Sequence, residues 1–329
     1  MRQSSNSGRH LKIWAGQCYI VAGAQRCLPK LAVATFDLDA YLTARRSAVD
    51  RALERYLTKP SGCAQALRQA MRYGLFPGGK RIRPILTLAA GEIFGGKRKE
   101  LLPFACAIEM IHAYSLIHDD LPAMDDDDLR RGRPTAHKVF GEGMALLAGD
   151  GLLTEAFHLI SGPATRSLDP ELVLELIHEL GCAAGVAGLV GGQSTDLEAE
   201  DRKVDRAMVE SMHGRKTGAL ILASLKIGAR AGGANPAELK RISRYGEAVG
   251  LAFQIADDIL DGAGEEARHE SGRKEARKAT YPSVVGIAQA RERLSNLTRQ
   301  AMASLAPFGA RAEPLRAIAG YVAERALAT

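Results

Sequence analysis

The feature that most constrains this chain is a dense acidic stretch that directly follows an apolar one. Residues 104–117 are mostly apolar at helical spacing, which predicts a buried helix. Six aspartates then fall between Asp119 and Asp128, and two arginines follow at once. Carboxylates packed this closely repel one another, and placing them at the end of a core helix is costly unless a cation compensates them. Carboxylate oxygens are natural ligands of Mg²⁺, so the stretch predicts a magnesium site.

A second acidic group follows another apolar helical run, residues 249–252, and includes Asp257 and Asp261. These two aspartates are four residues apart, so they share one helix face, and Gln254 lies on the same stripe. One such motif also occurs on capped or solvent-facing helices. Two of them on core helices, each with basic residues nearby, favour a two-sided clamp for Mg²⁺ and a polyphosphate.

Both motifs resemble the two aspartate-rich motifs of the trans-isoprenyl diphosphate synthases. The first, Asp119-Asp120 followed after four residues by Asp125, is similar to the long form of the bacterial farnesyl/geranylgeranyl diphosphate synthase branch. The resemblance runs from about Asp37 to the C-terminus. It implies about three Mg²⁺ ions per active site. Their ligands would be Asp119, Asp125, Asp257 and Asp261.

Helical periodicity dominates the chain after residue 36, strand-like alternation is short, and aromatic residues make up only 5%. These features predict an all-α fold, with a first helix from Asp37 to about Leu57 and a second from about Ala64 to Tyr73. No Pro/Gly/Ser-rich linker divides residues 36–329, which favours one domain. The resemblance implies a single large helical bundle around a central substrate cavity.

Residues 1–35 contain five cationic side chains and no acid, so they account for most of the net charge of +6. The remaining chain is nearly balanced and has no basic patch interleaved with aromatics, so we expect no nucleic-acid partner. The composition of this leader matches an organellar transit peptide. Two other interpretations, a disordered extension or sequence upstream of the true start, are preferred.

The chain has no run of about 20 unbroken apolar residues, so we expect no membrane span. Its five cysteines form no CxxC pair and no framework spacing, which favours a reduced, intracellular protein. We therefore predict a cytoplasmic location, with an organellar one as the alternative. The uncharged, Gly- and Ala-rich residues 181–195 predict a helix that passes close to its neighbours or to a substrate channel, and Gln193 lies in a segment that resembles the family.

A glycine-rich basic turn precedes these motifs. Gly74, Gly79 and Lys80 have the spacing of a P-loop, but Arg81 stands where Ser or Thr is required and no strand precedes the turn. The glycine backbone N–H groups beside three cations, the third being Arg83, predict a diphosphate cradle instead. An ordinary loop with water-facing cations is the alternative. The resemblance implies that Lys80 and Arg83 contact isopentenyl diphosphate.

Three further basic side chains flank the first acidic stretch. His112 lies two helical turns before Asp119, where a lone histidine in an apolar helix is most often a core residue. Arg130 and Arg131 directly follow the stretch, and charge alone is consistent with two surface arginines that balance the aspartates. The resemblance assigns His112 and Arg131 to isopentenyl diphosphate and Arg130 to the allylic diphosphate.

Lys216 enters an apolar run, so it either extends along the protein surface to water or faces a ligand. In the family that the chain resembles, the residues corresponding to Lys216, Thr217 and Gln254 surround the reacting carbon. A polar, cationic loop follows the second acidic motif and suits a lid over a diphosphate. Lys278 matches a family lysine in this loop, whereas Arg268 stands where the family usually has another lysine.

The reaction that this resemblance implies is the Mg²⁺-dependent head-to-tail condensation of isopentenyl diphosphate with dimethylallyl or geranyl diphosphate. Tyr114 lies five residues before Asp119, about 7.5 Å along the same helix. A bulky residue there stops growth at fifteen carbons in the family, so we predict farnesyl diphosphate as product. A geranylgeranyl diphosphate synthase is the alternative.

Two other classes of protein stay open. A class I terpene cyclase shares an aspartate-rich motif, but its cavity usually has abundant aromatics, and it does not need the basic glycine turn. A non-catalytic partner subunit usually lacks one aspartate-rich motif, and both are intact here. The resemblance also implies a homodimer.

Overall fold

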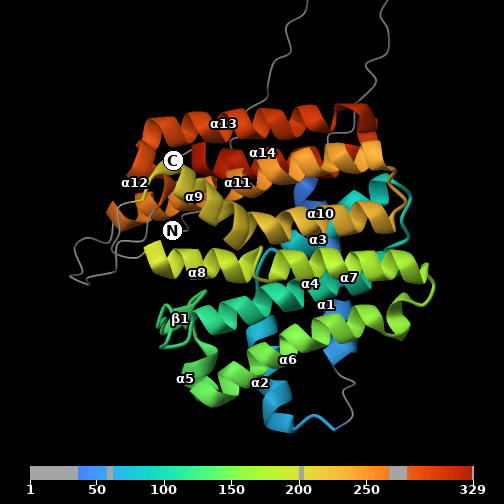
Figure 1. Cartoon of the computed structure of the whole chain (residues 1–329), viewed down its shortest axis with the longest axis vertical. Coiled ribbons are helices and arrows are strands. Elements are labelled where there is room, and N and C mark those ends of the chain that lie inside the picture. Colours follow the sequence, from blue (N-terminus) through green and yellow to red (C-terminus); the bar gives the residue numbers. More distant parts are fainter. Residues whose placement is uncertain (1–35, 58–61, 200–203, 267–279, 328–329) are drawn as a thin grey trace, which may run out of the picture. The chain divides into compact units, whose positions relative to one another are not determined.

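Helix α4, Arg98–Asp119, lies in the middle of the bundle and ends at the first acidic stretch (Figure 1). Its buried residues occur on every side of the helix and include Phe104, Ile108 and Ile111. A helix that is apolar all round is covered all round by other helices. This confirms the predicted core helix and places Asp119 at its carboxyl end.

The computed structural model describes residues 36–57, 62–199, 204–266 and 280–327, and the side chains of 263–266 lie outside that description. The described residues belong to one compact unit, Phe36–Thr329. Residues 1–35, for which the sequence left three interpretations open, lie outside the described residues.

The helices of the first half pack around α4. Helices α1 and α2 begin and end within two residues of the predicted positions, because the same apolar positions that predicted them face the core. The elements are α1 (Leu38–Leu57), α2 (Gln65–Leu75), α3 (Ile82–Ile93), α5 (Ala136–Phe140), α6 (Glu142–Ser161) and a 3-10 turn (Pro163–Thr165).

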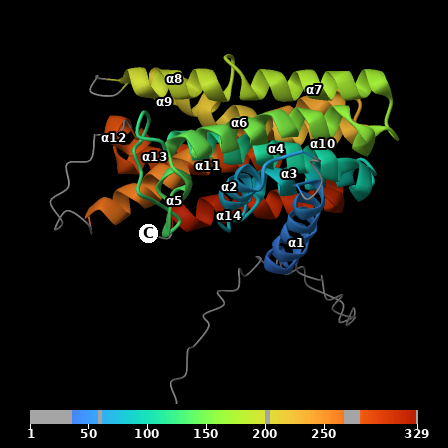
Figure 2. The ribbon, with the colours of Figure 1, turned by 90° about the horizontal axis from the view of Figure 1, so that it is seen from below.

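The helices of the second half run mostly alongside α4, with α7 and α8 forming the outer row at the top of Figure 2. They are α7 (Pro170–Ala184), α8 (Leu189–Ala199), α9 (Arg206–His213), a π-helical turn (Gly214–Gly218), α10 (Ala219–Ala231), α11 (Pro236–Glu266), α12 (Tyr281–Val285), α13 (Ile287–Ser304), a 3-10 segment (Ala306–Ala312) and α14 (Glu313–Leu327).

The strands of the described ranges form one small hairpin between α4 and α5. Strands β1 (Leu129–Arg130) and β2 (Arg133–Pro134) pair antiparallel, with Arg130 opposite Arg133. Arg131 and Gly132 form the turn with φ of 54° and 74°. Positive φ at both central residues is typical of the tight turns that match the twist of a hairpin. The predicted all-α fold is therefore confirmed.

Two apolar cores lie on either side of a wall made by α3 and α10, which place residues in both. The wall is tight because Gly228 of α10 lies against α3: a Cβ there would approach the carbonyl oxygen of Thr87 to 2.1 Å. One end of this wall, at the left of Figure 1, gathers the start of α10, β1, α9, α12 and the end of α14. The predicted site residues lie there.

By length and composition alone, two helical stretches of the described chain could cross a membrane: Arg98–Asp119 and Pro170–Ala199. In the first, 78% of the apolar window is buried inside the protein, as expected of a core helix. In the second, which comprises α7 and α8, only 33% is buried. Its exposed apolar side chains therefore need another explanation, which we propose below.

Candidate active site

The first acidic stretch turns back on itself at the end of α4. The backbone N–H of Asp125 donates to the carbonyl of Asp119 at 2.8 Å, and that of Asp126 donates to Leu121 at 3.2 Å. Asp126 adopts a φ of 49°, a conformation that aspartate tolerates better than most residues. Asp119 and Asp125 are six residues apart in the chain. This turn, rather than helical periodicity, brings them into one site.

Burial raises the pKa of Asp119 to about 6. Lys216 and Arg130 oppose that rise, while the neighbouring carboxylates Asp125 and Asp120 add to it. The ionised carboxylate is therefore under-compensated by the protein's own cations. A bound divalent cation would compensate the buried negative charge and reduce the repulsion between the neighbouring carboxylates.

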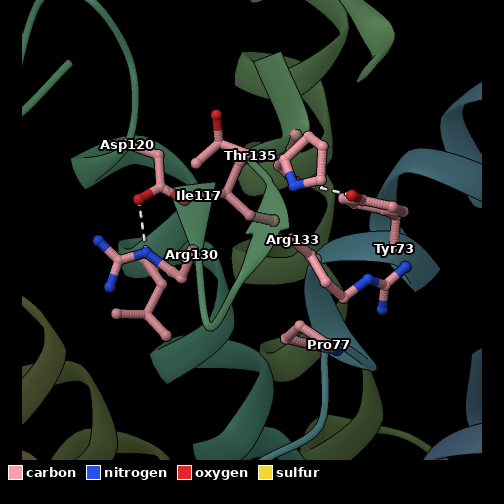
Figure 3. Close-up of a pocket in the computed structure, with 11 residues that line it drawn as sticks. Tyr73, Pro77, Ile117, Asp120, Arg130, Arg133 and Thr135 are labelled. Carbon is pink, nitrogen blue, oxygen red and sulfur yellow. Dashed lines mark hydrogen bonds and ion pairs between the residues drawn. The ribbon is translucent and has the colours of Figure 1, made fainter. Parts of the chain in front are cut away.

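Asp120, the next residue, faces a different direction. Its carboxylate is 4% exposed and accepts a hydrogen bond from Nε of Arg130 at 2.5 Å, as Figure 3 shows. Arg130 also donates to Asp127 at 3.3 Å. Arg130 thus balances two nearby aspartates, as in the alternative that the sequence left open.

The hairpin that carries Arg130 is fixed from its other side by α2. The hydroxyl of Tyr73 donates to the carbonyl of Pro134 at 2.6 Å, and the Arg133 guanidinium lies 4.6 Å from the Tyr73 ring centre. A small pocket of about 30 Å³ lies between the hairpin, α2 and α4, with Ile117 and Pro77 in its lining (Figure 3). A pocket of this volume holds about one water. It is therefore too small for the predicted substrates.

The second acidic motif lies within α11, which continues without interruption from Pro236 to Glu266. Burial raises the pKa of Asp257 to about 6, and the like charge of Asp261 contributes to the rise. Arg325 and Lys80 oppose it, so two cations from distant segments face this carboxylate. Arg325 comes from α14, and sequence reasoning missed it because it lies far along the chain from both acidic motifs.

The glycine turn before α3 separates its three cations, and the prediction that all three serve one cradle is wrong. Arg81 has a φ of 53° and points into the core, where Nε donates to Asp50 at 2.9 Å and Nη1 to Glu109 at 2.7 Å. Its Nη2 donates to the carbonyl of Leu75 at 2.7 Å. A buried guanidinium with its donors satisfied in this way is a structural bond between helices. Lys80 remains near the site.

Lys80 and Arg325 meet at one aromatic ring on α14. The Lys80 ammonium lies 5.2 Å from the ring centre of Tyr321, and the Arg325 guanidinium lies 5.8 Å from it. The ring face attracts both cations. The C-terminal helix therefore contributes to the basic side of the site.

Arg83 lies half-buried beside His112, and its Nη1 is 3.2 Å from the histidine Nε2. Burial lowers the pKa of His112 well below its usual value, and Arg83 lowers it further. A guanidinium only donates, so His112 is neutral and accepts through Nε2. Within the described residues, Nε of Arg83 has no hydrogen-bond partner. This pair can therefore receive an anion.

Arg131 closes the same region from the hairpin. It donates to the carbonyl of Gly78, and a Cβ on Gly79 would lie 2.3 Å from its Nη1. Burial lowers the pKa of Arg131, with Arg81 and Arg130 as nearby like charges. The glycine at position 79 is needed for this close approach.

Lys216 and Thr217 lie in the π-helical turn between α9 and α10. Such bulges widen a helix locally and are frequent at functional sites. Lys216 donates to Asp196 of α8 at 2.6 Å, and the Thr217 hydroxyl donates to Oε1 of Gln254 at 2.8 Å. Sequence reasoning missed Asp196, although it is the first charge after the uncharged residues 181–195.

Helix α8 comes close enough for this because it carries glycine at the contact. A Cβ on Gly192 would lie 2.3 Å from the backbone nitrogen of Lys216, which confirms the predicted close approach of this helix. Neighbouring Gln193 is buried, and neither polar atom of its amide has a hydrogen-bond partner in the described ranges. A buried amide without partners is costly, so Gln193 is a candidate for contact with a ligand or water.

Tyr114 is buried on α4 one turn before the acidic stretch, and it packs edge-on against the His118 ring at 5.7 Å between centres. Burial raises the pKa of its hydroxyl, and Asp119 contributes, so the tyrosine lies near the first acidic motif. His118 in turn fills the space beside Gly149 of α6. Tyr114 therefore packs against His118, which itself lies against α6.

The acidic residues fit Mg²⁺ in pairs. Among the described side chains, no group of three or more Asp, Glu, His or Cys residues could hold a metal by itself. Mg²⁺ usually binds one or two carboxylates plus waters and substrate phosphates, rather than an all-protein cage. The pairs Asp119/Asp125 and Asp257/Asp261, with their under-compensated charge, match that mode. Lys278 and Arg268 of the cationic loop lie outside the described residues.

The model of the polyprenyl synthetase family matches residues 64–307. The farnesyl diphosphate synthase of Geobacillus stearothermophilus is 47% identical over 266 residues, covering 80% of this chain and 89% of that protein. The chloroplastic geranylgeranyl pyrophosphate synthase of Catharanthus roseus is 43% identical over 296 residues, covering 88% and 82%. The solved geranyltransferase of Legionella pneumophila has a TM-score of 0.80 at 34% identity, covering 88% of this chain and 98% of that one. The chain thus belongs to the polyprenyl synthetase family of trans-isoprenyl diphosphate synthases.

Proposed function

We propose that this protein condenses isopentenyl diphosphate head-to-tail with dimethylallyl and geranyl diphosphates, and that its product is farnesyl diphosphate. One observation carries the proposal: the turn at Lys216 and Thr217 lies close to both acidic motifs. Lys216 interacts with Asp119 of the first motif, and Thr217 hydrogen-bonds Gln254, one helical turn before Asp257 of the second. Carboxylate pairs that can hold a divalent cation, together with a nearby lysine, suit the departure of a diphosphate.

The allylic substrate is proposed to bind with its diphosphate between the two acidic motifs. Asp119, Asp125, Asp257 and Asp261 would hold Mg²⁺, which would supply positive charge to stabilise the leaving diphosphate. Arg130, Lys216 and Lys278 would bind the same group. Because Arg130 is paired with Asp120 and Lys216 with Asp196, a bound diphosphate would compete with these carboxylates for the two cations.

Isopentenyl diphosphate is proposed to bind at the second basic group, formed by Lys80, Arg83, His112 and Arg131. The neutral His112 and the unsatisfied Nε of Arg83 support this assignment, because an anion would satisfy the buried donor. The C1–O bond of the allylic substrate breaks, with its electron pair leaving on the diphosphate, and the double bond of isopentenyl diphosphate then attacks the resulting C1 cation. The proton lost from isopentenyl diphosphate then passes to the departing diphosphate.

The proposed product length rests on Tyr114. Its buried ring near Asp119 supports a floor that limits growth to fifteen carbons. Tyr114→Ala is expected to release that limit and give products longer than fifteen carbons in a radiochemical chain-length assay. Tyr114→Phe keeps the ring and serves as the matched control. Fifteen-carbon products alone from Tyr114→Ala would contradict the assignment.

A homodimer is proposed, with α7 and α8 at its interface. These helices and the connection between them expose apolar side chains, among them Leu174 of α7 at 66% and Val186 of the connection at 84%. Monomeric proteins rarely expose large contiguous apolar patches. Light scattering should give a dimer for the wild type and a monomer for Leu174→Glu with Val186→Glu. A wild-type monomer would contradict the proposal.

We also propose a cytoplasmic location. The cysteines of the described part, Cys63, Cys106 and Cys182, are free, as expected in a reducing compartment. Fractionation of cells that make the full chain, including residues 1–35, would test this, and recovery in an organelle would contradict it.

The experiment that tests the proposed activity is a product analysis of the purified full chain. It would receive Mg²⁺, labelled isopentenyl diphosphate and, in turn, dimethylallyl, geranyl or farnesyl diphosphate. We expect a fifteen-carbon product from the first two and no elongation of the third. Products longer than fifteen carbons would keep the mechanism and overturn the length limit, whereas no condensation with any substrate would overturn the activity.

A further inference from the structure

The second aspartate of the α11 motif, Asp258, is buried at 5% exposure, although the proposed metal ligands flank it in sequence. Consecutive residues of a helix lie about 100° apart, so Asp258 is directed to one side of Asp257, toward Gln254 one turn earlier. Its two oxygens are used inside the protein. Oδ1 accepts from Nε2 of Gln254 at 2.8 Å, and Oδ2 accepts from the backbone N–H of Tyr281 at 2.7 Å.

The hydrogen bond to Asp258 determines which way the Gln254 amide points. An ionised carboxylate only accepts, so the NH₂ group of Gln254 must face Asp258. The amide oxygen then faces the opposite way and accepts from the Thr217 hydroxyl at 2.8 Å. Because the single hydroxyl hydrogen of Thr217 is used in that bond, the remaining lone pairs of both oxygens are free to face a ligand.

This orientation has a chemical consequence that rests on the proposed function. When the C1–O bond of the allylic substrate breaks, its electron pair leaves with the diphosphate and C1 becomes positive. Oxygen lone pairs fixed toward that carbon stabilise it, whereas an N–H or O–H pointing at it would oppose it. Preorganised dipoles act most strongly where charge develops away from water.

We propose that Asp258 is a positioning residue, which holds the Gln254 amide so that Gln254 and Thr217 present oxygen lone pairs to the reacting carbon. Its second bond, to Tyr281, joins this network to the start of α12. His213 of α9 also lies beside it, with 3.7 Å between Nε2 and Oδ2. Asp258 therefore acts through its neighbours and is not itself a metal ligand or a catalytic residue.

The test exchanges the acid and the amide between positions 258 and 254. Asp258→Asn keeps an acceptor for Tyr281 but lets the Gln254 amide rotate. We expect kcat to fall about 10²-fold, as for a misplaced catalytic group, with KM for both substrates and the Mg²⁺ requirement unchanged. In Asp258→Asn with Gln254→Glu, the asparagine NH₂ donates to the new carboxylate, which again accepts from Thr217. This double variant should recover about tenfold in kcat.

The matched control is Thr280→Ala, which removes the side-chain cap of α12 but leaves the contacts of Gln254 in place. We expect its kcat to stay near the wild-type value, so that a loss in Asp258→Asn cannot be ascribed to a loosened α12. If Asp258→Asn did not fold, Gln254→Glu would be compared with the double variant instead. Gln254→Glu places a second carboxylate beside Asp258, whereas the double variant has only one carboxylate at these two positions.

Three results would overturn the proposal: wild-type kcat in Asp258→Asn, a double variant no better than the worse single variant, or an equal loss in Thr280→Ala. Failure of the proposed function looks different, because the wild type itself would then show no condensation. That result would overturn both proposals, whereas an active wild type with an insensitive Asp258 would overturn only this one.

Discussion

The first acidic motif starts at the last residue of α4 and continues through turns, whereas the second lies inside one uninterrupted helix, α11. In the first, a backbone hydrogen bond between Asp119 and Asp125 folds the chain back. In the second, helical spacing alone places Asp257 and Asp261 on one face. Two different backbone routes thus lead to the same result, a pair of carboxylates whose first member has a pKa of about 6.

The comparison extends to the second residue of each Asp-Asp pair. Asp120 and Asp258 are 4% and 5% exposed, and each is hydrogen-bonded within the protein. Asp120 holds Arg130, a cation proposed to bind the diphosphate, whereas Asp258 holds the neutral amide of Gln254. Adjacent identical residues therefore have different tasks, because the helix points them in different directions. The first motif positions a charge and the second an amide dipole.

The largest expected effect comes from the first aspartate of either pair. Asp119→Ala or Asp257→Ala should each lower kcat by about 10³-fold, because the charge that develops on the leaving diphosphate loses its stabilisation. Steady-state kinetics with geranyl diphosphate would measure this. Asp169→Ala, which removes only the side-chain cap of α7, is the control and should retain activity. Near-wild-type turnover in either site variant would refute the metal assignment.

The second prediction separates the two hydrogen-bonded partners. Arg130→Met leaves Asp120 buried without its arginine, so the free energy of unfolding should fall by about 2 kcal/mol. Urea denaturation would measure it. Adding Asp120→Asn should recover part of the loss, because the uncompensated charge is then removed. A double variant that is less stable than Arg130→Met would show that the pair is not the source of the loss.

The third prediction concerns pH in the absence of Mg²⁺. Folding raises the pKa of Asp119 and Asp257 from 3.8 to about 6, so the folded state holds protons that the unfolded state releases. Stability should therefore decline as pH rises from about 4 to about 6. Asp119→Asn with Asp257→Asn should flatten that decline in thermal unfolding followed over this pH range. An unchanged slope in the double variant would contradict the assignment of the pKa values.

The smallest expected effect concerns a cation of the second motif. The charge of Arg325 on α14 opposes the raised pKa of Asp257, whereas Lys216 and Arg130 are the described cations that do so for Asp119. Arg325→Met should raise KM for the diphosphate substrates about twofold to fivefold, as for a partly exposed charge interaction. Initial rates over a range of substrate concentrations would show it. Glu324 lies on the same turn and is exposed, so Glu324→Met serves as the control. An equal rise in KM in that variant would contradict the proposed role of Arg325 in substrate binding.

Sequence periodicity predicted the all-α fold, the core helix before Asp119 and the shared face of Asp257 and Asp261, because burial and helical spacing are local properties. It failed at Arg81, since a short basic run does not show which cation turns inward. Only the acceptors Asp50 and Glu109, 31 and 28 residues away, decide that.

Other contacts could not be predicted from the sequence either, because the two partners of each contact come from different structural elements. Asp196 meets Lys216 from 20 residues away, and Tyr281 meets Asp258 from 23. Neither spacing repeats a helical period, so no local pattern predicts either pair. The division of tasks within each Asp-Asp pair likewise became visible only once their hydrogen-bond partners were known.

The most direct test of that division is a Mg²⁺ titration of the initial rate for Asp119→Asn, Asp120→Asn, Asp257→Asn and Asp258→Asn. We expect the half-activating Mg²⁺ concentration to rise in the variants of Asp119 and Asp257. It should keep its wild-type value in the other two, although their maximal rates are lower. A rise for Asp258→Asn as large as that for Asp257→Asn would contradict the account, because Asp258 would then act through the metal.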